Sequence, residues 1–203
     1  MWREDFAYAN GPLDLEGGWI TSAIFGQALD VVSNTATDAS ASAQGSSNST
    51  VLATADLAAP YNLSITFDYV YSPTNRSAIQ IIIGDIAGRF LVMTFSDGTG
   101  QGLSNQCDFT YLDPDGNSHD MTAGQYDGTS SNFLIAGVNV LQIVFDGTTV
   151  SVSVNGIGFF SFVPSGWGTV TTNDLDFGLY SDGFPVAGGI AVTEILFNGT
   201  QLP

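Results

Sequence analysis

The chain has 203 residues, 20 acidic residues against three arginines, no lysine and a formal net charge of −17. Nucleic-acid binding needs cationic side chains that neutralise phosphates, so this composition argues against it. No apolar run approaches the roughly 20 residues that span a bilayer, and no signal peptide is visible, so membrane insertion is not expected either. The length fits one all-β domain, which we predict to cover residues 1–203.

The first recognisable strand follows a long polar segment. Residues 33–50, SNTATDASASAQGSSNST, are small and polar, which predicts a long surface loop or a pair of edge strands. Residues 62–71 then place Ile65, Phe67 and Tyr69 on one face and polar side chains on the other. This period-two alternation predicts a strand with one buried face.

Denser apolar runs occupy the centre of the chain. Residues 78–83 and 90–95 predict central strands covered on both faces, and residues 107–111 alternate again. Cys107 is the single cysteine, so no disulfide can form within the chain, and we expect it to be a small buried side chain.

A second polar segment, residues 113–132, is predicted to be a long surface loop. Asp113, Asp115 and Asn117 stand at every second position in DPDGN, with Asp120 close behind. Such oxygen-bearing side chains can surround Ca²⁺, although Pro-Asp-Gly is also a common turn. The sequence therefore leaves a calcium site and a plain turn both open. The segment is not an EF-hand, because its twelfth position is Gly124 and not glutamate.

The stretch FDGTTVSVSVNG, residues 145–156, predicts a hairpin. Its valines alternate with serines between Asp146-Gly147 and Asn155-Gly156, pairs that supply the positive φ angles of two-residue hairpin turns. The valines are expected to pack between two sheets.

Aromatic residues in polar or glycine-rich loops are the candidates for sugar binding. A ring stacks on the apolar face of a sugar while neighbouring polar groups bind its hydroxyls. Trp167 in PSGWG is the best candidate, with Tyr126 and Phe184 as others, although a loop tryptophan can also close one end of a sandwich. Trp2 and Trp19 are expected to fill the core or cover an edge.

In order, these segments resemble the concanavalin A-like (lectin/glucanase, laminin-G-like) jelly-roll family. The opening FAYANGPLDLEGGW resembles the start of such modules, ITFDYVY, AIQIIIG and FLVMTFS their long strands, and FDGTTVSVSVNG their late hairpin. DFGLYSDG and AGGIAVTEILFNG resemble their last strands. The resemblance spans nearly the whole chain and implies an all-β fold, a two-sheet antiparallel β-sandwich with function on its concave face and rim loops.

Catalysis is not expected. The hydrolases of this family carry a Glu-x-Asp-x-x-Glu strand, whereas the glutamates here are Glu4, Glu16 and Glu194, none followed by this pattern. The closest approach to a carboxylate pair is Asp174 and Asp176, which are also compatible with solvation at the start of a strand. A serine nucleophile would require the single histidine, His119, which is expected to lie in a polar turn.

Two functions remain open. The first is a non-catalytic structural protein displayed on an assembly, such as a bacteriophage capsid decoration or tail-fibre protein, with capsid or tail proteins as partners and a possible homo-oligomer. The alternative is a glycan-binding, lectin-like adhesion module, with Ca²⁺ as a possible cofactor. Glycoside hydrolysis is a third, less favoured function. The expected location is the virion surface or the extracellular space.

Overall fold

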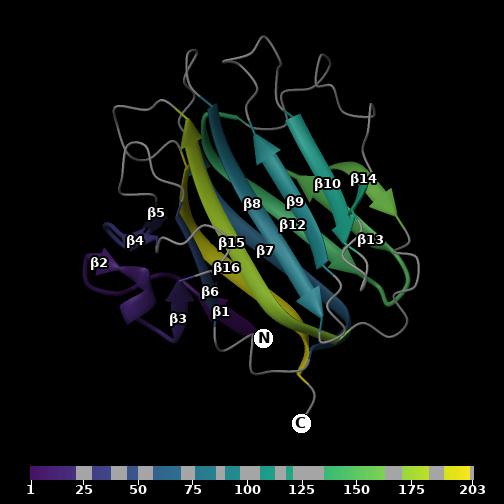
Figure 1. The fold of residues 1–203 in the computed structure, drawn as a ribbon, viewed down its shortest axis with the longest axis horizontal. Helices are drawn as coiled ribbons and strands as arrows, with labels where there is room; N and C mark the ends of the chain where they lie inside the picture. Colours follow the sequence, from purple (N-terminus) through teal and green to yellow (C-terminus); the bar gives the residue numbers. More distant parts are fainter. Residues whose placement is uncertain are drawn as a thin grey trace.

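The computed structural model describes residues 1–21, 29–37, 45–49, 57–69, 76–85, 90–96, 106–112, 118–120, 135–162, 171–182 and 190–201 (Figure 1). These residues form sixteen β-strands and one short 3-10 helix, η1 (Leu13–Leu15). Every strand pair is antiparallel, and within the described ranges no helix is long and apolar enough to cross a membrane.

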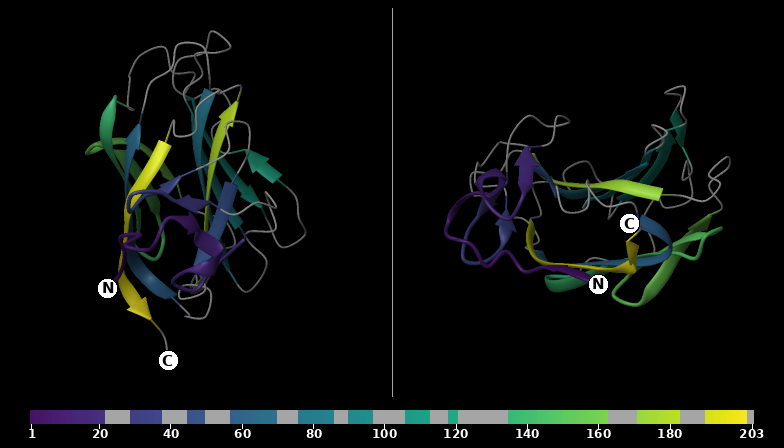
Figure 2. Two further views of the ribbon diagram at one scale, coloured as in Figure 1. Left: turned by 90° about the vertical axis from the view of Figure 1, so that its left-hand side faces the viewer. Right: turned by 90° about the horizontal axis from the view of Figure 1, so that it is seen from below.

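The strands form two layers (Figure 2). We name the first layer the β7 sheet. Its main strands, in spatial order, are β14 (Ile157–Phe162), β13 (Val150–Val154), β12 (Gly137–Phe145), β7 (Leu57–Tyr69) and β16 (Ile190–Gln201). The short strands beside β16 are β1 (Trp2–Glu4), β5 (Ala36–Thr37), β4 (Asp30–Val31) and β2 (Gly11–Pro12).

We name the second layer the β15 sheet. In spatial order it contains β3 (Trp19–Thr21), β6 (Gly45–Ser49), β15 (Thr171–Asp182), β8 (Arg76–Asp85), β9 (Phe90–Ser96), β10 (Gln106–Leu112) and β11 (Ser118–Asp120). At one end the two layers are continuous, because Thr171 and Thr172 of β15 pair with Ala58 and Leu57 of β7.

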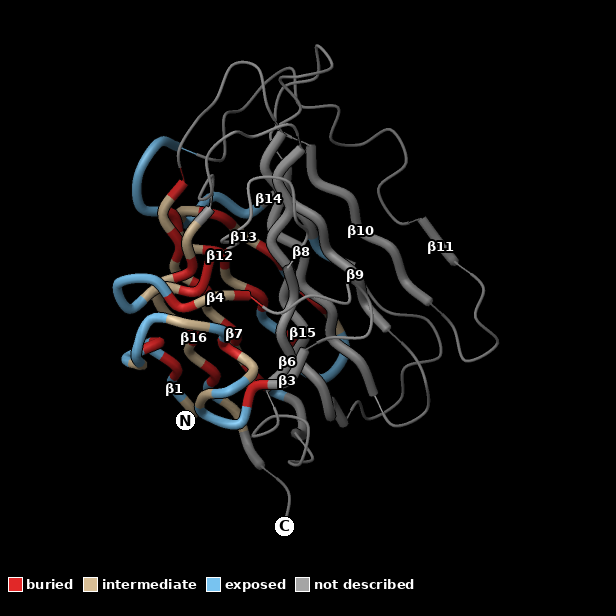
Figure 3. The backbone as a smooth tube through the Cα atoms, turned by 60° about the vertical axis from the view of Figure 1, so that its left-hand side comes forward, coloured by how far each residue is buried: buried red, intermediate tan, exposed pale blue. Residues whose placement is uncertain are grey.

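The core follows the alternation predicted for β7 (Figure 3). Tyr61, Leu63, Ile65, Phe67 and Tyr69 are all buried, whereas the residues between them are partly exposed. Burial of each such side chain contributes roughly 1.5–3 kcal/mol. The inner positions of β12 and β13 add the buried set Leu141, Ile143, Phe145, Val150, Val152 and Val154. The predicted packing of the hairpin valines in the core is therefore confirmed.

The β13–β14 turn has the predicted form. Asn155 (φ 53°) and Gly156 (φ 76°) both adopt left-handed backbone between the paired residues Val154 and Ile157. The preceding turn differs from the prediction, because four residues separate the paired Phe145 and Val150. Asp146 closes this longer loop by accepting hydrogen bonds from the Thr149 and Thr148 amides at 2.7 and 2.8 Å, which lower its pKa.

Both polar segments contain strands. For residues 33–50 a long surface loop or a pair of edge strands was predicted, and for residues 113–132 a long surface loop. Residues 33–50 include β5 and β6, and β6 is inserted between β15 and β3. In residues 113–132, β11 pairs with β10, and His119 lies opposite Tyr111 in this strand and not in a turn. Backbone pairing overrides the low β-propensity of serine, glycine and asparagine in β6.

A buried carboxylate connects the two layers near the N-terminus. Glu4 of β1 lies opposite Ile195 in the β7 sheet, while Trp19 begins β3 of the β15 sheet. Glu4 Oε2 accepts hydrogen bonds from Trp19 Nε1 at 2.9 Å and from the Tyr8 hydroxyl at 2.8 Å, and Oε1 accepts one from the Phe6 amide at 2.7 Å. Trp19 is 1% exposed, which confirms it as a core residue, and the half-buried Trp2 packs against it at 6.3 Å.

Candidate functional site

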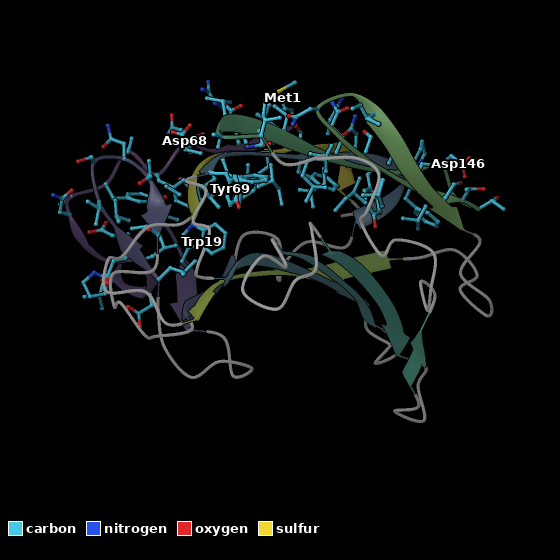
Figure 4. The ribbon with its side chains drawn as sticks, turned by 90° about the horizontal axis from the view of Figure 1, so that it is seen from above. Met1, Trp19, Asp68, Tyr69 and Asp146 are labelled. Carbon is cyan, nitrogen blue, oxygen red and sulfur yellow. The ribbon has the colours of Figure 1, made fainter. Side chains whose placement is uncertain are left out.

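The β15 sheet bends so that its concave side faces away from the β7 sheet (Figure 4). Trp19 is buried between the two layers and therefore identifies the inner face of the β15 sheet. Residues opposite each other on paired strands share a face, and successive residues along a strand alternate between the two faces. Starting from Trp19, the strand register therefore tells which face of the β15 sheet each position belongs to.

The inner face is apolar in sequence. Trp19 pairs with Ser49, and Ser47 two positions earlier pairs with Phe177. The row through Phe177 continues through Ile81 and Met93 to Phe109. This register puts apolar residue types of β15, β8, β9 and β10 on the same face as Trp19, the arrangement that a sandwich core requires.

The concave face is the opposite one, and its positions are rich in polar residue types. One row runs from Ser46 through Gly178, Gln80 and Thr94 to Asp108. The next row in one direction contains Asn48, Asp176, Ile82, Val92, Thr110 and Asp120. The next row in the other direction contains Tyr180, Ala78, Ser96 and Gln106.

Charge is distributed unevenly between the two sheets. The strands of the β15 sheet contain one arginine, Arg76, and six aspartates: Asp85, Asp108, Asp120, Asp174, Asp176 and Asp182. Amides, hydroxyls and carboxylates on a curved sheet can together donate to and accept from a ligand with many hydroxyl groups. Tyr180 and Phe90 add two aromatic positions to the same face.

The sequence-predicted sugar-binding residues Trp167, Tyr126 and Phe184 lie outside the described residues. The same holds for three of the four predicted calcium ligands, Asp113, Asp115 and Asn117. The fourth, Asp120, is the last residue of β11 and falls on the concave face opposite Thr110. Where side chains are described, no three His, Cys, Asp or Glu residues form a group that could hold a metal ion.

The concave-face residues Asn48, Gln80, Thr94 and Asp108 were not among the sequence-predicted site residues. Gln80 and Thr94 each interrupt an apolar run, and that interruption is the one signal the sequence offers. Asp174 and Asp176 fall at successive concave-face positions of β15, as the spacing predicts.

No protein-family model and no curated protein sequence matches this chain. Solved structures do share its fold. The CBM2 module of the evolved Dit of Lactobacillus casei BL23 phage J-1 is similar over 100% of this chain and 96% of its own, with a TM-score of 0.67 and 12% identity.

Two further structures cover 97% of this chain. The carbohydrate recognition domain of Emp46p, in its potassium-bound form, has a TM-score of 0.60 over 95% of its own chain, at 10% identity. A glycoside hydrolase family 16 endo-glucanase from Bacteroides ovatus has a TM-score of 0.58 over 99% of its own chain, at 8% identity. Identities this low bear on the fold alone. The two-layer antiparallel architecture and these likenesses show that the chain has the concanavalin A-like jelly-roll fold.

Proposed function

We propose that this chain is a non-catalytic glycan-binding module displayed on a multi-subunit assembly such as a bacteriophage virion. The observation that carries the proposal is the concave face of the β15 sheet. There, the register aligns Gln80, Thr94 and Asp108 in one row across three neighbouring strands. These are amide, hydroxyl and carboxylate groups, the types that bind sugar hydroxyls.

The comparisons support the choice of ligand. Two of the similar structures are a CBM2 module and a carbohydrate recognition domain. Tyr180, on the row next to Gln80, supplies a ring of the kind that stacks on the apolar face of a sugar. The ligand we propose is therefore an oligosaccharide that lies across several strands of the sheet.

The display role rests on charge and on one comparison. A net charge of −17 without lysine keeps a protein soluble at high copy number and away from nucleic acid. The similar Dit module belongs to a phage. We propose capsid or tail proteins as partners and the virion surface or extracellular space as the location. We also propose that the chain is one domain, since β1 pairs with β16 and β6 with β15, which interleaves its two ends.

A glycan array screened with the wild-type protein tests the proposal. For a glycan that binds, Gln80→Ala and Asp108→Asn should each weaken binding about tenfold, which corresponds to about 1.4 kcal/mol for one polar contact. The exposed turn residue Thr148, on the β12–β13 turn of the other sheet, provides the control variant Thr148→Ala, which should bind as the wild type does. Absence of binding to any glycan, or equal binding by all variants, would contradict the proposal.

The rim-loop aromatic and the predicted calcium ligands need separate measurements. Binding of the glycan to the wild type is measured with Ca²⁺ and again with a chelator. Binding of the same glycan to the Trp167→Ala variant is measured separately. Loss of glycan binding on chelation would assign the 113–120 segment to the site. Loss of glycan binding in the Trp167→Ala variant would assign the segment that contains Trp167 to the site. If neither change alters binding, the concave face alone holds the glycan.

Hydrolysis is the competing function, because Asp174 and Asp176 fall together on the concave face. Retaining and inverting glycosidases both act with two carboxyl groups, about 5.5 Å or about 6.5–9.5 Å apart. We expect no release of reducing ends when the wild type is incubated with the glycan it binds. Release that is abolished by Asp176→Asn would replace the binding proposal with an enzymatic one.

A further inference from the structure

The outer face of the β7 sheet is almost free of charge. The strands β7, β12, β13, β14 and β16 contain two charged residues, Asp68 and Glu194. Glu194 is already paired with Arg3, whose Nη2 lies 2.7 Å from Glu194 Oε1. With Arg3, these five strands therefore carry about one net negative charge, from Asp68, in a chain whose total is −17. This contrasts with the aspartate-rich strands of the β15 sheet.

The centre of this face is defined by outward positions on β12 and β7. They are Val138, Val140, Gln142, Val144, Ser64 and Thr66, which we call the neutral face. Val138 is 60% exposed and Val144 is 40% exposed, whereas the inward positions of the same strands are buried. Apart from Gln142, the side chains of the neutral face are the short ones of valine, serine and threonine.

The position of the charges matches the organisation of a protein interface. Interfaces have an uncharged centre and a polar rim. Asp68 lies at one end of the neutral face, opposite Val138, and the Arg3–Glu194 pair lies along its β16 flank. Ser151 and Ser153 of β13 extend it on the other flank without adding charge. The nine residues of β12 are about 30 Å long, and four neighbouring strands are together about 15–20 Å wide. The area of this rectangle approaches the area that one partner buries in a standard interface.

The chemistry of the neutral face identifies its occupant. A basic partner would be attracted to the aspartate-rich strands and not to this face, and an acidic partner would gain nothing from it. The valines of the neutral face are uncharged, and its hydroxyl and amide groups both donate and accept hydrogen bonds, so the face is complementary to itself. Two copies of this chain repel each other strongly in any arrangement that brings their acidic surfaces together, and least when their neutral faces meet.

We propose that two copies of this chain form a two-fold dimer through their neutral faces. A two-fold axis brings the same patch of each copy together, which is the common form of homodimer contact. The concave faces of the two β15 sheets then point in opposite directions, so that the dimer presents two separate outer surfaces.

Mass measured by light scattering and by sedimentation tests the dimer. We expect a mass approaching twice the 21.3 kDa of one chain, reached at lower protein concentration when NaCl rises from about 50 to about 500 mM, because salt screens the repulsion between acidic chains. Weakening of the dimer by salt would instead indicate a contact made by ion pairs elsewhere. A mass of one chain at all concentrations and salt conditions would overturn the proposal.

Substitutions locate the contact. Gln142→Glu and Ser64→Glu each bring like charges together across the axis and should raise the dimer dissociation constant at least tenfold, whereas the neutral Gln142→Ala should dimerise. Leu15→Glu adds the same charge at a side chain that is 78% exposed on η1, away from the neutral face, and should leave the dimer intact. Circular dichroism confirms that each variant is folded. Dissociation by Leu15→Glu, with the neutral-face variants still dimeric, would place the contact elsewhere.

Discussion

Glu4 shows how much one side chain contributes to the N-terminal part of the sandwich. Its carboxylate accepts three hydrogen bonds, and one of its donors is the amide of Phe6, a buried residue held at a φ of 52°. Positive φ is unfavourable for a bulky residue, so the surrounding contacts must compensate for it. Phe6 stacks on Trp19 at 6.1 Å, and Trp19 is itself bonded to Glu4. These three residues are therefore mutually dependent.

The neighbouring Tyr8 and Gly17 complete this arrangement. Partial burial and the hydrogen bond to Glu4 raise the pKa of the Tyr8 hydroxyl, which stays protonated and able to donate. A Cβ at position 17 would collide with that hydroxyl, and Gly17 also has a φ of 57°. The close approach of Tyr8 thus explains why position 17 is a glycine.

Glu4→Gln should lower the free energy of unfolding by about 2 kcal/mol, because the amide replaces one accepting oxygen with a donor while three donors remain. Urea denaturation followed by tryptophan fluorescence measures this value, and the exposed Asp5→Asn serves as the control with a change below about 0.5 kcal/mol. Equal stability of the two variants would show that Glu4 is replaceable.

At the scale of elements, the start of β12 and the tip of the β13–β14 hairpin are joined by two asparagines. Asn139 is fully buried, accepts from the Ile135 amide and from Asn155 Nδ2, and donates to the carbonyls of Ile135 and Gly137. The side-chain oxygen of Asn155 accepts a hydrogen bond from the Val140 backbone amide, and the backbone amide of Asn155 donates one to the Val140 carbonyl. The hairpin tip is therefore fixed to β12 by side chains as well as by the strand ladder.

Asn139→Ala should destabilise the protein by about 3 kcal/mol, because several buried donors and acceptors lose their partner together. Hydrogen exchange at the Val140 amide should accelerate more than exchange in the centre of β7. Asn198→Ala, at an exposed position of β16, provides the control. Unchanged exchange at Val140 would mean that the ladder alone holds the hairpin tip.

The sequence predicted some elements well and others poorly, for identifiable reasons. The strand of residues 150–154 was predictable because its alternation and its Asn-Gly turn are both local signals. The position of β6 inside a sheet was not predictable, because its glycine, serines and asparagine pair between β15 and β3, which are distant in sequence. The same limit applies to the candidate site: Asn48 and Asp176 share a row through a pairing that no local pattern reveals.

At the scale of the whole molecule, the net charge of −17 opposes the compact state in the absence of salt. We expect the melting temperature to rise when NaCl increases from about 10 to about 150 mM, since the Debye length falls from about 30 to about 8 Å. Each 1 kcal/mol gained corresponds to about 2–4 °C for a chain of this size. Scanning calorimetry of the Ser64→Glu variant separates this effect from dimerisation, and a melting temperature independent of salt would contradict it.

The pairing of β1 with β16 also determines how the molecule responds to mechanical load. Trp2 lies beside Phe197, and the two strands are antiparallel, so tension between Met1 and the end of β16 pulls their neighbouring ends apart. The ladder is then unzipped one pair at a time, the geometry in which hydrogen bonds resist force least. Peeling passes the pairs of Trp2 and Arg3 and stops at Glu4, whose three hydrogen bonds must break together. On the β1 side of a stretched chain, we therefore expect this carboxylate to be the first point that resists peeling.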